Sequence, residues 1–173
     1  MEYIINGNFQ KELQDGWATT YPVHRRADEQ AGEPDEQFFA YFGAGGQLAQ
    51  SFALNAPKPF SVRLSLGIQV TGGDNKPNGN LLLTVMSQAG TDPWQYQTYA
   101  INEFESWQTA YLVLPVDKSI ERMGVIFAVS RGFNAGVSIR KVSFTDAVAV
   151  DASGVEKRYE GPVRPEGLPA DFG

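Results

Sequence analysis

The stretch from Phe60 to Val70 has the cleanest period of two in this 173-residue chain. Its apolar residues occupy every second position, and polar or small residues lie between them. The apolar set is Val62, Leu64, Leu66, Ile68 and Val70, and the other set is Arg63, Ser65, Gly67 and Gln69. A period of two puts alternate side chains on opposite faces of a β-strand. The stretch therefore predicts a strand with one face in a core and one face in water.

A second patterned stretch, from Gly136 to Thr145, predicts a strand with a β-bulge. Its apolar residues alternate in one parity up to Ile139 and in the opposite parity from Val142 onward. One extra residue must lie near the Arg140-Lys141 pair, as in a bulge. We expect this strand inside a sheet, paired with an opening strand from Tyr3 to Phe9, because a domain whose first and last strands pair leaves few frayed ends. Asn6-Gly7 readily adopts positive φ, so we expect it to kink or turn that opening strand.

The composition favours an all-β fold. Aromatic residues make up 12% of the chain, which has 18 Gly and 10 Pro, and long helical periodicities are absent. We expect about nine or ten strands separated by turn residues, the spacing typical of a β-sandwich of two antiparallel sheets. The polar stretch from Val23 to Gln37 is expected to be a long loop, either functional or mobile.

We expect two parts in the chain, a β-sandwich domain at residues 1–148 and an extended Pro/Gly-rich tail at residues 149–173. The tail has too few apolar residues to form its own core. Four spaced apolar residues nonetheless make it a candidate arm, anchored on its own domain or on a neighbouring subunit. These candidate partner-binding residues are Tyr159, Val163, Leu168 and Phe172.

The charge and the cysteine content exclude several kinds of partner and cofactor. A net charge of −6 argues against nucleic acid and anionic membranes as partners. The chain has no cysteine, so disulfides and thiolate metal sites are excluded. It shows neither a signal peptide nor a membrane span, and we expect synthesis in the cytoplasm of a host cell without a cleaved signal. No cofactor is expected.

The order of several short motifs resembles the jelly-roll carbohydrate-binding modules, which have a galactose-binding-like fold. The motifs are Asn6-Gly7-x-Phe9, Gly16-Trp17, Gln50-Ser51-Phe52-x-Leu54, Trp107-Gln108-Thr109 and Val137-x-Ile139-x-x-Val142-x-Phe144. The likeness runs from Tyr3 to Asp146 and leaves the tail unmatched. It implies a jelly roll with Trp17 and Trp107 in the core.

The resemblance also implies a structural calcium, and this chain departs from the family there. Such modules hold the ion with an acidic residue just after the first Phe and an aspartate at the bulge of the last strand. The corresponding residues are Gln10 and the Arg140-Lys141 pair. Two cations are incompatible with a hard cation at that place, so we expect no metal there.

Five residues are candidates for glycan binding, which needs aromatic faces flanked by polar side chains. Trp94 and Tyr96 share a parity beside the Gly90 to Pro93 loop, and Tyr41, Arg63 and Gln69 can line a polar sheet face. The structural alternative makes Trp94 a loop anchor and Tyr41 a core residue. Fold membership alone does not decide between them.

No catalytic residues are assigned. His24 is the single histidine and lies beside two arginines in a charged stretch, where a solvated side chain is expected. The acidic residues of the same stretch resemble glycosidase carboxylates only in type, and a solubilising role is the simpler interpretation. They are Asp28, Glu29, Glu33, Asp35 and Glu36. The loop from Asp74 to Asn80 lacks the terminal Glu of a calcium loop and is expected to be a hairpin turn.

Three functions remain open, and the favoured one is a non-enzymatic structural protein of a bacteriophage virion. As a capsid decoration, collar or tail-fibre adaptor it would dock on other subunits of a larger assembly and form a homo-oligomer. The alternative is a glycan-binding module that recognises polysaccharide through exposed aromatic residues. A jelly-roll lyase or hydrolase has the least support, because no catalytic constellation is recognisable.

Overall fold

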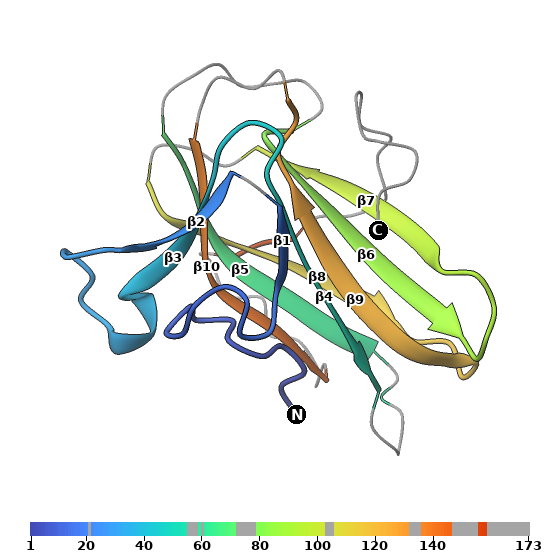
Figure 1. Ribbon diagram of the computed structural model, residues 1–173. Helices are drawn as coiled ribbons and strands as arrows, with labels where there is room; N and C mark the ends of the chain where they lie inside the picture. The colour runs from blue at the N-terminus through green and yellow to red at the C-terminus, as the bar shows by residue number, and fades with distance from the viewer. Residues whose placement is uncertain are drawn as a thin grey trace.

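The computed structural model describes residues 1–20, 22–54, 59, 61–71, 79–102, 106–131, 136–146 and 156–158. Two β-sheets pack face to face (Figure 1). The strands of the first half are β1 (Ala18–Thr20), β2 (Val23–Ala27), β3 (Phe38–Phe42), β4 (Gln47–Ala53) and β5 (Ser61–Thr71). Those of the second half are β6 (Leu81–Ala89), β7 (Gln95–Ile101), β8 (Gln108–Pro115), β9 (Ile120–Ala128), β10 (Gly136–Asp146) and β11 (Glu156–Arg158). One short 3-10 turn, η1 (Pro34–Glu36), precedes β3.

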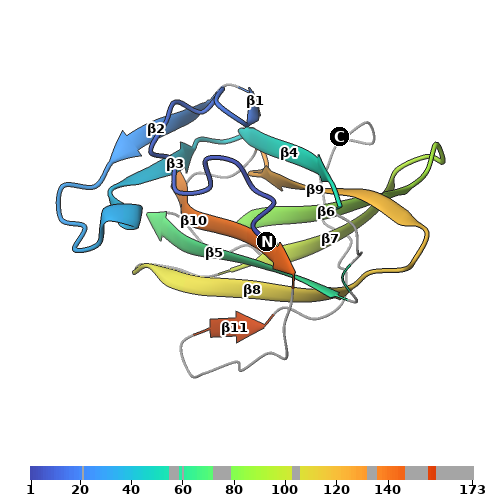
Figure 2. The same cartoon turned by 90° about the horizontal axis from the view of Figure 1, so that it is seen from below.

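The five-stranded sheet has the order β1-β4-β9-β6-β7, and the six-stranded sheet has the order β11-β8-β5-β10-β3-β2. β1 to β10 pair antiparallel, whereas β11 pairs parallel to β8 (Figure 2). The predicted all-β sandwich of two antiparallel sheets is confirmed. The predicted domain boundary at residue 148 lies outside the described residues.

The core lies between the sheets, and β5 shows why the fold forms. All five apolar residues of its inward set, from Val62 to Val70, are buried, while the alternate residues face outward. Trp17 is buried in the same core and lies beside Phe9 and Phe127. Burial of each such side chain contributes about 1.5–3 kcal/mol.

The predicted bulge in the last long strand is confirmed. β10 pairs with β5, and the register between them shifts between Arg140 and Ser143. Lys141 takes a positive φ of 52°, which absorbs the extra residue. Because of this shift, the strand buries Ile139 before the bulge and Val142 after it.

The opening segment from Tyr3 to Phe9 lies beside β10 and turns at Asn6, as predicted, but it does not form a regular strand. The Tyr3 backbone N–H donates to the carbonyl of Phe144 at 2.9 Å, and the Val142 N–H donates to the carbonyl of Gly7 at 2.8 Å. Between these two bonds the backbone turns, because Asn6 has a φ of 55°. A left-handed residue breaks the extended conformation, so the pairing is reduced to its two ends.

The predicted loop from Val23 to Gln37 is wrong in its first part, because it begins with β2. This strand forms one edge of the six-stranded sheet and pairs with β3. Its sequence, Val-His-Arg-Arg-Ala, hides the alternation because only Val23 is buried. Within the described ranges, no helix is long and apolar enough to cross a membrane.

Candidate functional site

A groove runs across the outer face of the six-stranded sheet, and Trp107 lies at its centre. We name it the Trp107 groove. It is formed by Asp28, Glu29, Glu36, Phe39, Ser65, Gly67, Gln69, Trp107, Thr109, Arg140 and Lys141. The residues come from β3, β5, β10, the start of β8 and the segment between β2 and β3. The register places the outward residues of these strands side by side, which is why they meet.

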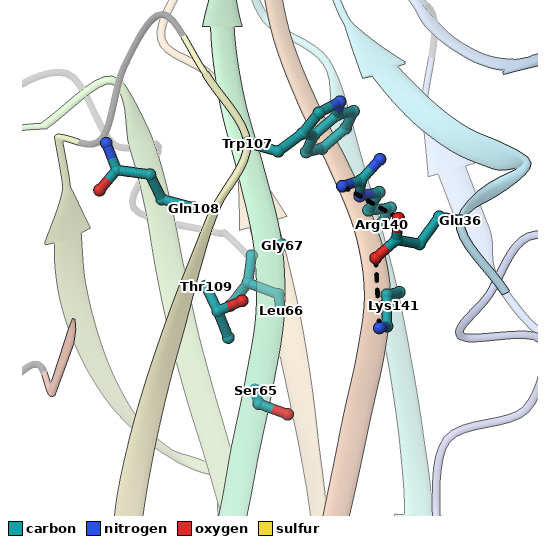
Figure 3. A pocket seen from close by; sticks show the side chains of 9 residues that line it. All are labelled: Glu36, Ser65, Leu66, Gly67, Trp107, Gln108, Thr109, Arg140 and Lys141. Atoms are coloured by element: carbon teal, nitrogen blue, oxygen red, sulfur yellow. Dashed lines mark hydrogen bonds and ion pairs between the residues drawn. The ribbon is translucent and has the colours of Figure 1, made fainter. Parts of the chain in front are cut away.

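Trp107 is held in place by an aromatic ring and a cation. The ring of Phe39 meets it edge to face, with centroids 5.7 Å apart. The guanidinium carbon of Arg140 lies 4.0 Å from the centroid of the Trp107 ring, and Figure 3 shows the two side chains next to each other. The prediction that Trp107 belongs to the core is therefore wrong. Its half-buried ring lies on the outer face, immediately before β8.

Arg140 also joins the sheet to the acidic segment that follows β2. Its guanidinium pairs with the carboxylate of Asp28 at 3.6 Å and with that of Glu36 at 3.5 Å. Glu36 in turn contacts the ammonium of Lys141 at 3.4 Å (Figure 3). The Arg140 side chain is only 12% exposed, so solvent screens these pairs less than it screens surface ion pairs.

The bulge makes these ion pairs possible. It brings two consecutive cations, Arg140 and Lys141, within reach of the same acidic segment, with Lys141 also 3.4 Å from Asp35. The expectation that the five acids only solubilise the chain is thus wrong for Asp28, Asp35 and Glu36. These three fix the segment that forms one wall of the groove.

The floor of the groove is formed by small and hydroxyl-bearing residues of β5 and β8. Ser65, Gly67 and Thr109 line a hollow of about 210 Å³ between Trp107 and Lys141 (Figure 3). Arg140 packs closely on Gly67, where a Cβ would lie 3.0 Å from Cγ of Arg140.

On the other side of Trp107, the groove widens into an open depression of about 670 Å³. Phe39 and Gln69 form its base, and the segment from Ala27 to Gly32 forms its rim. The whole groove therefore combines two aromatic rings with amide, hydroxyl and carboxylate groups. Such a surface can pack against the C–H face of a sugar ring and form hydrogen bonds with its hydroxyls.

Beside Gln10, where the resemblance implies an acidic calcium ligand, the guanidinium of Arg25 binds the backbone. Nε of Arg25 donates to the carbonyl of Phe9 at 2.7 Å, and its Nη2 donates to that of Gln10 at 2.8 Å. The same guanidinium lies 3.7 Å from Glu12 and stacks on the ring of Phe38. Across the described ranges, no group of three His, Cys, Asp or Glu side chains is suited to hold a metal ion.

Of the five predicted glycan-binding residues, Gln69 lies in the Trp107 groove. Tyr41 is on the same face, but the Arg26 guanidinium covers its ring at 3.8 Å, and a Cβ at Gly136 would overlap that ring. Arg63 lies farther along β5, above the ring of Tyr111 at 4.8 Å. The structure does not bring the three residues together.

Trp94 and Tyr96 belong to the other sheet. Trp94 is half-buried directly before β7, and Tyr96 is 48% exposed on that strand. Tyr96 borders a hollow of about 240 Å³ that also contacts Leu114 and Met123. On the same strand, burial raises the pKa of the Tyr99 phenol by desolvation, which keeps that group neutral.

The remaining predictions from the sequence have mixed outcomes. His24 is exposed on β2, as expected for a solvated side chain. Four predicted tail anchors lie outside the described residues, namely Tyr159, Val163, Leu168 and Phe172. Most of the predicted hairpin loop from Asp74 to Asn80 lies outside them too. Sequence reasoning missed Phe39, Trp107 and Arg140 as site residues, although Phe39 and Arg140 share the outward parity of their strands.

Comparison with known proteins identifies the fold. No protein-family profile matches the chain, and no curated protein sequence is significantly similar to it. Among solved structures, the enzymatically active domain of tailspike protein 4 of bacteriophage CBA120 is similar with a TM-score of 0.65 and 18% identity. The match covers 83% of this chain but only 21% of the tailspike chain.

Carbohydrate-binding modules are similar over nearly their whole length. TmCBM61, solved with β-1,4-galactotriose, has a TM-score of 0.56 and 11% identity, over 85% of this chain and 99% of the module. The CBM22-1 xylan-binding domain of Xyn10C from Paenibacillus barcinonensis has a TM-score of 0.55 and 14% identity, over 86% and 95%. The fold of this chain is the jelly roll of carbohydrate-binding modules.

Proposed function

We propose that the protein is a non-enzymatic glycan-binding module and that the Trp107 groove is its binding surface. This proposal rests on the arrangement of Trp107, Phe39 and Arg140 on the outer face of the six-stranded sheet. An aromatic platform buttressed by a cation and a second ring is pre-organised, so little conformational entropy is lost when a sugar packs on it. The similarity to one module solved with β-1,4-galactotriose and to another named as xylan-binding supports this class of ligand.

The charges of the groove favour a neutral glycan over an acidic one. Three carboxylates, from Asp28, Glu29 and Glu36, line the groove against two cations, Arg140 and Lys141, and both cations are already paired with carboxylates. A uronic acid would meet this carboxylate-rich rim and a guanidinium that is already paired. Neutral hydroxyls, by contrast, can accept from Arg140 and donate to the carboxylates.

The test is calorimetric titration of the full chain with β-1,4-galactotriose and xylan oligosaccharides, preceded by a glycan-array screen. We expect Trp107→Ala to weaken binding by more than tenfold, about 1.4 kcal/mol, and Trp107→Phe to retain part of it. Tyr96→Ala, on the other sheet, is the matched aromatic control and should bind as the parent does. Loss of binding with Tyr96→Ala and not with Trp107→Ala would reject the Trp107 groove.

A non-enzymatic role is proposed on the geometry of the acids. Asp28 and Glu36 are both tied to Arg140, which leaves neither one positioned as a free proton donor beside a free base. The similar tailspike domain is described as enzymatically active, so the question has a direct test. Incubation with the bound oligosaccharide should leave its length unchanged in chromatography, and cleavage that Glu36→Gln abolishes would overturn this part.

We also propose a place for the protein in a bacteriophage particle, as a capsid decoration, collar or tail-fibre adaptor that forms a homo-oligomer. The similarity to a phage tailspike domain supports this proposal. The two proposals are compatible, because a virion protein can also touch surface glycans. Mass spectrometry of purified particles and light scattering of the isolated chain test it, and a monomer absent from particles would contradict it.

A further inference from the structure

The outer face of the five-stranded sheet is apolar and buried, although the core between the sheets does not include it. Ile126 is 1% exposed and Leu82 is 4% exposed, and Met86 and Ala128 are buried too. None of these four belongs to the core cluster between the sheets. The alternation of side chains along a strand explains why. Phe127 and Leu83 pair with each other and face the core, so the next pair, Ile126 and Thr84, faces outward.

Two further observations indicate that this face is dry. The hydroxyls of Thr84 and Thr98 lie 2.8 Å apart and bond to each other, and both residues are buried. Exposed hydroxyls have water as a partner, whereas buried ones must find a protein partner. In addition, Met86 lies flat across Gly124, since a Cβ there would meet the Met86 methyl group.

The second sheet cannot be what covers this face, because it packs on the opposite side. Small neighbours such as Ala49, which pairs with Ile126, are too short to enclose it. A large aliphatic side chain at the centre of a sheet face is shielded this fully only when another layer lies over it. The face therefore requires a covering segment.

The chain offers one segment of suitable position, length and composition. β11 extends the six-stranded sheet beyond β8, at the side of the sandwich where the five-stranded sheet ends with β7 (Figure 2). After β11 the chain continues from 159 to 173, 15 residues. Extended, they reach about 50 Å, while five strands span about 19 Å. Tyr159, Val163, Leu168 and Phe172 supply apolar side chains at intervals along it.

We propose that the outer face of the five-stranded sheet is the docking surface for the chain's own C-terminal segment, residues 159–173. The docked segment covers Leu82, Met86 and Ile126 with its apolar side chains. Its three prolines lack an N–H and disfavour a regular added strand, so side-chain packing holds it rather than sheet pairing. This inference is independent of glycan binding, because the Trp107 groove lies on the other sheet.

Disulfide trapping in the full chain tests the docking, and the absence of native cysteine makes every bond interpretable. Ala49→Cys or Ala128→Cys on the face is combined with Leu168→Cys or Phe172→Cys in the segment. We expect at least one pair to form an intramolecular disulfide under mild oxidation. His24→Cys, at the far edge of the other sheet, combined with the same segment cysteines, is the control.

The outcomes separate the possible occupants of the face. A higher yield of intramolecular disulfide than in the His24→Cys control supports the proposal. A covalent dimer would overturn it in favour of exchange between two copies, and no bond above the control would overturn it outright.

A second measurement does not depend on cysteine geometry. The full-length Leu168→Ser/Phe172→Ser variant should show a several-fold rise in bis-ANS fluorescence and a lower urea midpoint, because the apolar face becomes accessible. Arg164→Ser/Asp171→Ser alters the same segment without removing apolar groups and should change neither. Identical fluorescence for the two variants would contradict docking.

Discussion

The outer face of the six-stranded sheet carries charged and aromatic side chains, whereas that of the five-stranded sheet carries aliphatic side chains and a bonded pair of threonines. Both faces lie on the same sandwich and share one core. The difference teaches that alternation alone does not determine what an outward residue meets. Around Trp107 the outward residues meet solvent and ion pairs, whereas on the five-stranded sheet Leu82, Thr84 and Ile126 are buried.

The largest expected effect comes from placing a charge on the dry face. Ile126→Asp should cost about 3 kcal/mol or more in the free energy of unfolding, because an unpaired carboxylate is removed from water. The matched change Val113→Asp lies on the outer face of the six-stranded sheet, opposite Arg63, and should cost under about 1 kcal/mol. Urea denaturation of both variants measures the contrast, which disappears if both faces are equally wet.

Arg140→Gln tests the ion pairs that Arg140 forms with Asp28 and Glu36, and it should lower the free energy of unfolding by about 2 kcal/mol. The value lies between the ~1 kcal/mol of an exposed ion pair and the 3–5 kcal/mol of a broken buried one, because Asp28 and Glu36 are each 22% exposed at the side chain. Adding Glu36→Gln should recover part of the loss. Denaturation midpoints of the single and double variants measure this, and strict additivity would rule out the coupling.

Changes to the Thr84–Thr98 pair should have a smaller effect on stability, and the double variant should be more stable than the single one. Thr84→Val should cost about 1 kcal/mol, because it leaves the Thr98 hydroxyl buried without its partner. The double variant Thr84→Val/Thr98→Val should be close to the parent, since both polar groups are then gone. A thermodynamic double-mutant cycle checks this, and a double variant twice as unstable as the single one would mean that the face is hydrated.

The smallest effect is expected from metal removal. Arg25 contacts the carbonyls of Phe9 and Gln10, and Gln10 takes the place of the acidic calcium ligand that the resemblance implies. The melting temperature should therefore be the same in EDTA and in millimolar CaCl₂. Arg25→Ala should lower it by a few degrees in either medium, and a rise with calcium in the parent chain would contradict the assignment.

Much of the fold could be predicted from the sequence because burial imposes a period of two. The β5 alternation and the parity change at Arg140-Lys141 both appear in the structure as expected. The edge strand β2 was missed because one buried residue, Val23, leaves no periodic signal. In the opening segment the turn at Asn6 was predicted from Asn6-Gly7, but the second positive φ, at Phe9, has no comparable signal, and the two together prevent a regular strand.

The site was harder to predict than the fold, since it depends on residues that are distant in the chain. Trp107 was assigned to the core because large aromatic residues are usually buried. The two residues that contact Trp107 lie far from it in the sequence, because Arg140 belongs to β10 and Phe39 belongs to β3. Only the order of strands in the sheet brings the three together, and that order is not visible in local periodicity.

The bulge in β10 has a consequence for engineering. Arg140 and Lys141 attach the segment that contains Asp28, Asp35 and Glu36 to the sandwich through side chains. We expect that a replacement loop of another length can be grafted between β2 and β3 if it keeps two acids opposite these cations. The rim of the groove can then be replaced while both sheets stay unchanged. A library of such loops is a way to select modules with new sugar preferences.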